Sequence, residues 1–138
     1  MAGSGFPRRG SDMAAIPDDV RRFILTSIPS VPFLEAALLL RARNVELTSD
    51  DVARALYVSE PGALDLLNAL CAAGAVCVAL GEPPRYRFAP RDERMAAAFG
   101  RLADAYAADL VGVAKLIHDS THKNAQRFAD AFRLRKDR

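Results

Sequence analysis

The apolar residues of this 138-residue chain change their spacing twice, and these changes limit the folds open to it. Over residues 17–74 they recur every three or four positions, as on one face of an α-helix. Between Ala75 and Leu80 the period is two, which predicts a strand, and Arg85–Phe88 follows as a returning strand with cations on one face and aromatics on the other. Helical spacing resumes after residue 90. The chain is therefore predicted to be mostly α with one two-stranded hairpin.

Prolines and capping residues set the bounds of the predicted helices. Pro17 begins the first helix, and Pro32 opens the second, Phe33–Arg43. Thr48 or Ser49 can cap the third helix. The fourth helix begins at the segment Ser59–Pro61 and ends at Gly74. The residues before Pro17, numbers 1–15, are small, polar and aperiodic, and we expect them to form a flexible N-terminal arm.

The last third of the chain carries an apolar stripe with helical spacing, which predicts one helix of about 26 residues. Asp119–Thr121 interrupts the pattern before a shorter stripe and a basic tail. The long stripe forms either the core of one chain or the seam between two copies. Because the helix is long for the body it would cover, we favour a homodimer. The candidate interface is Met95, Phe99, Leu102, Tyr106, Leu110, Val113 and Ile117.

Composition excludes several classes of protein. With 51% hydrophobic and 26% charged residues, the chain has the balance of an ordinary globular domain. Its apolar runs are far shorter than the ~18–20 residues of a membrane span, and we expect no membrane partner. No secretory signal precedes two cysteines, so we expect a cytoplasmic protein. No phosphate loop and no nucleophile with an adjacent base is present, so we expect neither an enzyme nor a cofactor.

The segment Asp51–Val76 resembles that of small bacterial winged helix-turn-helix transcriptional regulators of the MarR-like or generic winged-helix type. Ala53 stands where that family places the alanine that lets two helices approach, and Val58 and Ser59 match its apolar turn residue and its cap. The residues Leu67, Leu70, Gly74 and Val76 follow at the family's offsets. The resemblance covers residues 33–88. It implies a winged helix with a two-stranded wing, to which this chain adds an N-terminal helix and long C-terminal helices.

The same resemblance implies a domain organisation and a function. Residues 16–90 would be the winged-helix domain with its N-terminal helix, and residues 91–138 the helical dimerisation region with a basic tail. Such regulators bind operator DNA as two-fold dimers, with the second helix in the major groove and the wing on the backbone. Our first hypothesis is therefore a dimeric regulator of transcription that binds double-stranded DNA.

Two features depart from the family pattern. Tyr57 stands where glycine is usual in a left-handed turn, at a cost of about 1 kcal/mol. The predicted second helix carries Glu60 and Asp65 but no cation, and a carboxylate about 5 Å from a phosphate costs ~3 kcal/mol at an effective dielectric near 20. DNA would then be held mainly by cations elsewhere, in a salt-sensitive and weakly selective way. The candidate DNA-binding residues are Arg85, Arg87, Asn68, Arg8, Arg9, Lys123, Arg127, Arg133, Arg135 and Lys136.

The alternative is a degenerate winged-helix module that binds a regulatory protein. Its candidate partner-binding residues lie on the second helix and are acidic or apolar: Glu60, Leu64, Asp65 and Leu66. The two leucines are either core residues or an exposed patch. Two interpretations are also open for the arginines of the hairpin and of the tail, which are either phosphate ligands or solvated charges.

Two pairs of residues resemble parts of other sites. His118 and His122 lie one helical turn apart, but no third ligand is evident, so we predict no metal site. Cys71 and Cys77 lack a Cys-x-x-Cys arrangement and are expected to be buried small hydrophobic residues.

Overall fold

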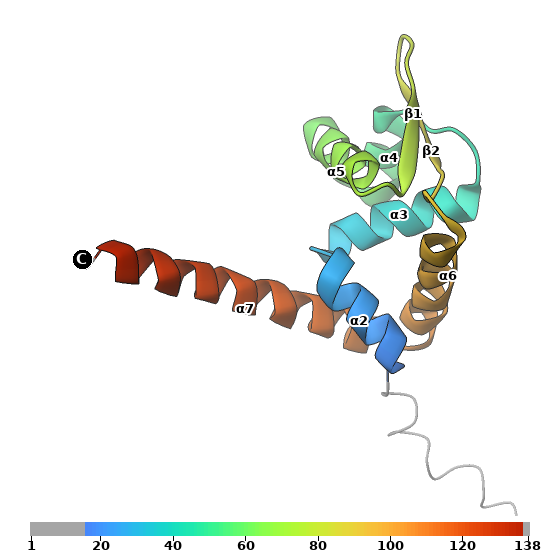
Figure 1. Cartoon of the computed structure of the whole chain (residues 1–138). Coiled ribbons are helices and arrows are strands. Elements are labelled where there is room, and N and C mark those ends of the chain that lie inside the picture. The colour runs from blue at the N-terminus through green and yellow to red at the C-terminus, as the bar shows by residue number, and fades with distance from the viewer. Residues whose placement is uncertain (1–15, 137–138) are drawn as a thin grey trace, which may run out of the picture. The chain divides into compact units, whose positions relative to one another are not determined.

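The computed structural model describes the backbone of residues 16–136 and the side chains of residues 16–123 (Figure 1). The described part is mostly helical with a two-stranded antiparallel hairpin, which confirms the prediction at that level. The predicted N-terminal arm, residues 1–15, lies outside the described residues. The elements are, in order, α2 (Asp18–Ser27), α3 (Val31–Arg43), α4 (Ser49–Leu56), α5 (Glu60–Ala72), β1 (Val76–Ala79), β2 (Arg85–Phe88), α6 (Glu93–Ala108) and α7 (Leu110–Lys136).

The chain divides into two compact units. Residues 31–103 form one of them, the central unit, which holds α3, α4, α5 and the hairpin. The residues up to Ser30 and from Asp104 onward form the flanking unit, which holds α2 and α7.

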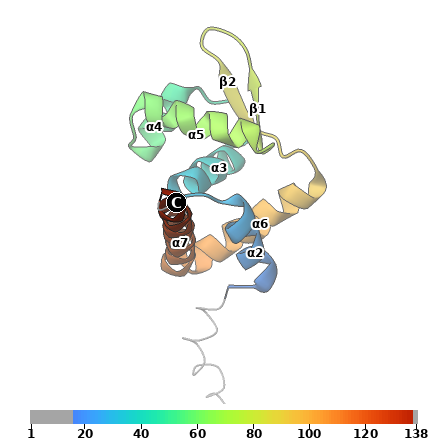
Figure 2. The ribbon, with the colours of Figure 1, turned by 60° about the vertical axis from the view of Figure 1, so that its left-hand side comes forward.

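Helix α3 is the centre of the central unit's core. It is apolar nearly all round, and Leu34 and Leu40 are fully buried along with Phe33, Ala36 and Ala37. A helix of this kind is stable only when other elements cover most of its sides. Helices α4 and α5 and strand β2 do so; Figure 2 shows α4 and α5 on one side of α3, with the hairpin beside α5.

Helices α4 and α5 are joined by a tight turn, and each begins at a predicted cap. Thr48 and Asp51 form a capping box: the Thr48 hydroxyl accepts from the Asp51 N–H at 3.1 Å, and the Thr48 N–H donates to the Asp51 carboxylate at 3.0 Å. The turn begins at Tyr57, whose φ of 60° is left-handed, as the sequence predicts. Ser59 then caps α5 by accepting from the Gly62 N–H at 3.1 Å.

The C-terminal end of α5 is closed by a glycine and an arginine. Gly74 has a φ of +84°, the backbone conformation that glycine tolerates and other residues rarely adopt. The Arg91 guanidinium donates to the Ala73 carbonyl at 3.3 Å, and the Arg91 N–H to the Gly74 carbonyl at 2.8 Å. Arg91 therefore holds the end of α5 against the chain that follows the hairpin.

The hairpin has one face in the core and one in solvent. Val76 pairs with Phe88 and Val78 with Tyr86, and opposed residues of antiparallel strands point to the same face. Val76 and Tyr86 are buried. The apolar period continues farther than the core does, however, and Val78 and the turn residue Leu80 are exposed.

The segment between α3 and α4 contributes an additional bridge to the hairpin. Leu47 and Tyr86 exchange two backbone hydrogen bonds of 2.8 and 2.7 Å. Leu47 is buried there. The backbone of the hairpin's β2 strand is thereby tied to the start of α4.

The prediction of one continuous helix after the hairpin is wrong. The helical pattern breaks at Asp109, between α6 and α7. The Asp109 carboxylate accepts from the Gly112 N–H at 3.0 Å, so a side-chain cap begins a new helix where the apolar spacing alone predicts none. The predicted interruption at Asp119–Thr121 is also wrong, because α7 runs through it to Lys136.

The predicted dimer seam is largely used within one copy. Phe99, Leu102, Val113 and Ile117 are buried in the single chain, and Phe99 makes a T-shaped contact with Phe88 at 5.5 Å. Met95 and Tyr106 are half-buried, and Leu110 is 54% exposed. At the four buried positions the stripe is core, not a free interface; the homodimer itself stays a prediction.

In the flanking unit, α2 packs on α7. Val20 and Ile24 are the buried residues of α2, and Val113 and Ile117 are the buried ones among the side chains of α7 that are described, residues 110–123. Just beyond α2, the Pro29 carbonyl accepts a 2.7 Å hydrogen bond from the Thr121 hydroxyl.

Candidate functional site

The exposed side of α5 is the strongest candidate for a binding surface. Glu60, Leu64, Asp65 and Asn68 are exposed, while Ala63, Leu67 and Leu70 turn into the core. These four exposed residues are named the α5 face here. Leu64 is 39% exposed, so its interpretation as a core residue is wrong. Leu66 is half-buried.

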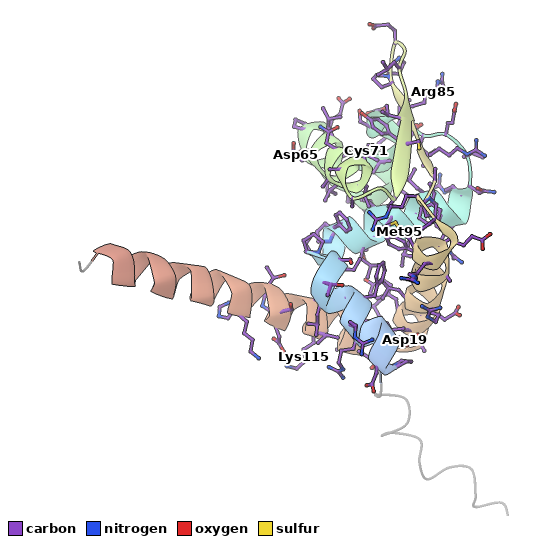
Figure 3. All side chains as sticks on the ribbon, in the orientation of Figure 1. Asp19, Asp65, Cys71, Arg85, Met95 and Lys115 are labelled. Atoms are coloured by element: carbon purple, nitrogen blue, oxygen red, sulfur yellow. The ribbon has the colours of Figure 1, made fainter. Side chains whose placement is uncertain are left out.

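The α5 face is acidic, and one of its carboxylates is held in place. Glu60 accepts a 3.0 Å hydrogen bond from the Ser49 hydroxyl, which joins the N-terminal ends of α5 and α4. Asp65 makes no hydrogen bond or ion pair with another described residue, and Figure 3 shows it at the outer edge of α5. The sequence of α5 contains no Lys, Arg or His. The surface therefore offers negative charge beside an exposed leucine.

Arg54 on the neighbouring helix α4 does not offset the negative charge of the α5 face. Arg54 lies 2.9 Å from Asp50 and 3.5 Å from Asp51, so its charge is matched on its own helix. The pKa of Asp51 is lowered, chiefly by the hydrogen bond from the Thr48 backbone N–H; burial is the next largest effect and opposes it, and the Thr48 hydroxyl and Arg54 lower the pKa further. Asp51 therefore stays ionised at neutral pH, and Arg54 is engaged by Asp50 and Asp51.

Tyr57 is a functional candidate that the sequence interpretation missed. Its side chain is 93% exposed, in the turn directly before the α5 face. The available signal was an aromatic residue at a left-handed position, where no local backbone preference favours it. Exposed aromatic and leucine side chains, here in the turn before α5 and on α5, are typical of a surface that binds another protein.

The hairpin carries a second candidate surface. Arg85 and Arg87 are exposed, lie two residues apart on β2 and therefore share one face (Figure 3 labels Arg85). Neither guanidinium has an ion pair or hydrogen bond within residues 16–123. Cys77 and Ala79, their cross-strand partners, are exposed on the same face. The geometry leaves both cations open to an anion.

The structure describes the side chains of two of the remaining predicted DNA ligands. Asn68 is exposed on α5 and Lys123 on α7. Arg8 and Arg9 lie outside the described residues, as do the side chains of the predicted tail cations Arg127, Arg133, Arg135 and Lys136.

The histidine and cysteine pairs form no further site in the described part. His118 and His122 are exposed and stacked at 6.3 Å, and residues 16–123 contain no group of three side chains able to hold a metal. Cys71 is half-buried, and burial chiefly raises the pKa of its thiol, with a smaller contribution from Cys77. Cys77 is exposed, so the expectation that both thiols are buried is wrong for it.

Over the part of the chain that is described, no single helix is both long enough and apolar enough to cross a membrane. No protein family, curated protein or solved structure matches the chain.

Proposed function

We propose that this chain is a winged helix-turn-helix module that binds a protein partner through the α5 face. The observation that carries the proposal is the chemistry of that face: two carboxylates and an exposed leucine, with no cation anywhere on α5. The second helix of a helix-turn-helix normally presents donors and cations to DNA. Here the same position offers what a protein surface with basic and apolar groups would bind.

The order of the elements supports the winged-helix part of the proposal. Three helices, α3 to α5, precede the hairpin, and the turn between α4 and α5 is only three residues long, Tyr57–Ser59. Val58 donates its N–H to the Ala53 carbonyl at 3.1 Å, so the apolar turn residue and the small helix residue of the family pattern are in direct contact.

Electrostatics weighs against insertion of α5 into a DNA groove. Glu60 and Asp65 would approach phosphates, and Arg54 is already engaged by Asp50 and Asp51. Like charges at such a contact oppose binding, and cations at the edge of the surface offset this only partly. A protein partner with complementary charge meets no such penalty.

The experiment is capture of partners by the tagged full chain from nuclease-treated lysate of the source organism, with quantitative mass spectrometry. We expect at least one protein to be retained by the wild type and depleted about tenfold by Leu64→Ala combined with Asp65→Lys. Glu82→Lys is the matched control, since it reverses an exposed charge in the hairpin turn. A partner retained equally by all three proteins, or lost on nuclease treatment, would overturn the proposal.

A second candidate function is contact with DNA through the hairpin. It is favoured by the exposed guanidiniums of Arg85 and Arg87 on one strand face, neither of which is paired with a side chain of residues 16–123. Titration of a labelled duplex followed by anisotropy, at 50 mM and 200 mM salt, tests it. If both arginines contact phosphates, replacing both by alanine makes the negative slope of log affinity against log salt shallower by about 1.8. Absence of binding at 50 mM salt removes this candidate.

A further inference from the structure

Helix α7 extends well beyond the element that covers it in its own unit. Its 27 residues correspond to about 40 Å, whereas the ten residues of α2 correspond to about 15 Å. The Thr121 hydroxyl donates a hydrogen bond to the carbonyl of Pro29, which lies two residues after the end of α2 at Ser27. Thr121 therefore marks the position on α7 where its pairing with α2 ends. From Thr121, α7 continues for 15 residues to Lys136, about 22 Å farther.

The sequence of this extension is basic and apolar. Residues 120–138 hold six basic residues (Lys123, Arg127, Arg133, Arg135, Lys136, Arg138) and two acidic ones (Asp130, Asp137), a net charge of +4. Phe128 and Phe132 lie four positions apart, the spacing of one helical turn. This segment therefore combines positive charge with large apolar side chains.

The α5 face and Tyr57 also combine charge with apolar side chains, but their charge is negative. Glu60 and Asp65 supply negative charge, and Leu64 and Tyr57 supply exposed apolar surface. Within the central unit, no described residue neutralises Asp65. One surface thus lacks cations and the other carries an excess of them.

We propose that the C-terminal segment of a second copy of this chain, residues 123–136, docks as a helix on the α5 face and Tyr57. This inference rests on the proposed protein-binding role of that face and names its partner. A helix laid with its apolar side on Leu64 and Tyr57 would bring its cations to the carboxylates of α5. If two copies exchange their tails reciprocally, the contact occurs twice and closes a two-fold dimer.

The reciprocal arrangement explains how a second copy is selected over a random basic peptide. Each chain brings both halves of the contact, so the second tail binds intramolecularly once the first is seated, at an effective concentration set by the linking chain. Each of the two contacts then needs only modest strength for the dimer to be stable. The tail also occupies the surface that any other partner needs, so such a partner must compete with it.

The direct test uses a fluorescent peptide of residues 120–138 and a full-length receptor that carries Arg133→Glu and Arg135→Glu, so that its own tail does not compete. We expect saturable binding that weakens at least tenfold when Asp65→Lys is added and less than twofold when the matched control Glu82→Lys is added. Raising salt from 50 to 300 mM is expected to weaken binding, since exposed charges are screened. Equal binding of the peptide to the receptors with and without Asp65→Lys, or no binding to either of them, overturns the inference.

Complementation between full-length variants, followed by light scattering after size exclusion, identifies the occupant. We expect the wild type and Glu82→Lys to be dimers, and Asp65→Lys and Arg133→Glu/Arg135→Glu each to be monomers. Mixing the two monomeric variants restores a 1:1 dimer, because one intact face meets one intact tail and the reversed charges at the second contact are again opposite in sign.

The other outcomes separate the alternatives. Dimers in all four proteins would place the dimer contact elsewhere and overturn the inference. A monomeric wild type whose face binds the peptide only when its tail charges are reversed would mean that the chain's own tail covers the face, which also overturns it. Failure of these tests, with loss of a lysate partner in the Leu64→Ala/Asp65→Lys protein, would leave the proposed function standing without this partner.

Discussion

Replacing Tyr57 by glycine is expected to make the protein more stable. Tyr57 has a φ of 60° and a ψ of 44°, and this left-handed conformation costs a residue with a Cβ about 1–2 kcal/mol. Its side chain is 93% exposed, so removing it sacrifices little packing. Glycine's greater freedom in the unfolded chain offsets about 0.4–1 kcal/mol of the gain. The net expectation is a stabilisation of about 0.5–1 kcal/mol.

The measurement is thermal and urea unfolding followed by circular dichroism at 222 nm, because the chain has no tryptophan to report by fluorescence. A gain of this size raises Tm by about 2–5 °C for a chain of this length. Tyr57→Ala is the control: it removes the same aromatic ring but keeps a Cβ in the left-handed turn, so no gain is expected. A Tyr57→Gly protein no more stable than Tyr57→Ala would refute the strain argument.

The same variant separates stability from binding. If Tyr57 is part of the docking surface, Tyr57→Gly binds the tail peptide more weakly than the wild-type face does, although it is the more stable protein. A residue that costs stability yet improves binding is one of the recognised forms of trade-off between the two. Undiminished peptide binding by Tyr57→Gly would remove Tyr57 from the surface.

Four further predictions concern the caps and the core. Thr48→Ala removes the capping box and is expected to destabilise the protein by about 1 kcal/mol in urea unfolding at pH 7. Because the pKa of Asp51 is lowered in the folded state, its contribution is present above about pH 4 and is lost as the pH falls through the folded value; Asp51→Asn should flatten that part of a stability–pH curve. Asp109→Ala is expected to cost about 1 kcal/mol by removing the cap of α7, against a change below about 0.5 kcal/mol for exposed Asp104→Ala, with helical ellipticity compared in both. Leu67→Ala, at a fully buried site, should cost about 2–5 kcal/mol, and a smaller loss would contradict the burial of α5 described here.

Local signals in the sequence predicted most elements correctly. Thr48, Ser59 and Gly74 act at helix ends through hydrogen bonds or backbone conformations that involve only near neighbours, so their residue types are enough to find them. The break at Asp109 was missed for the opposite reason. A seven-residue apolar stripe crosses it without interruption, and only the bond from the Gly112 N–H shows that the aspartate caps a new helix.

The candidate surfaces could be predicted only in part. The acidic and cation-free character of α5 is legible in its letters, and so are the arginines of β2. The exposure of Leu64 and Tyr57 is not, because an apolar residue on a helix or in a turn faces inward or outward according to what packs beside it. The same is true of Phe99 and Val113, for which the sequence favoured a seam between two copies over the chain's own core, where the structure places them.

The amino-acid order alone thus determined the kinds of elements, most of their ends and the sign of charge on each, since these follow from short-range sterics, hydrogen bonding and composition. Which apolar side chains remain exposed, and that Arg85 and Arg87 have no anionic partner within residues 16–123, were decided only by the tertiary structure. Those properties depend on distances between residues far apart in the chain, and no local pattern encodes such distances.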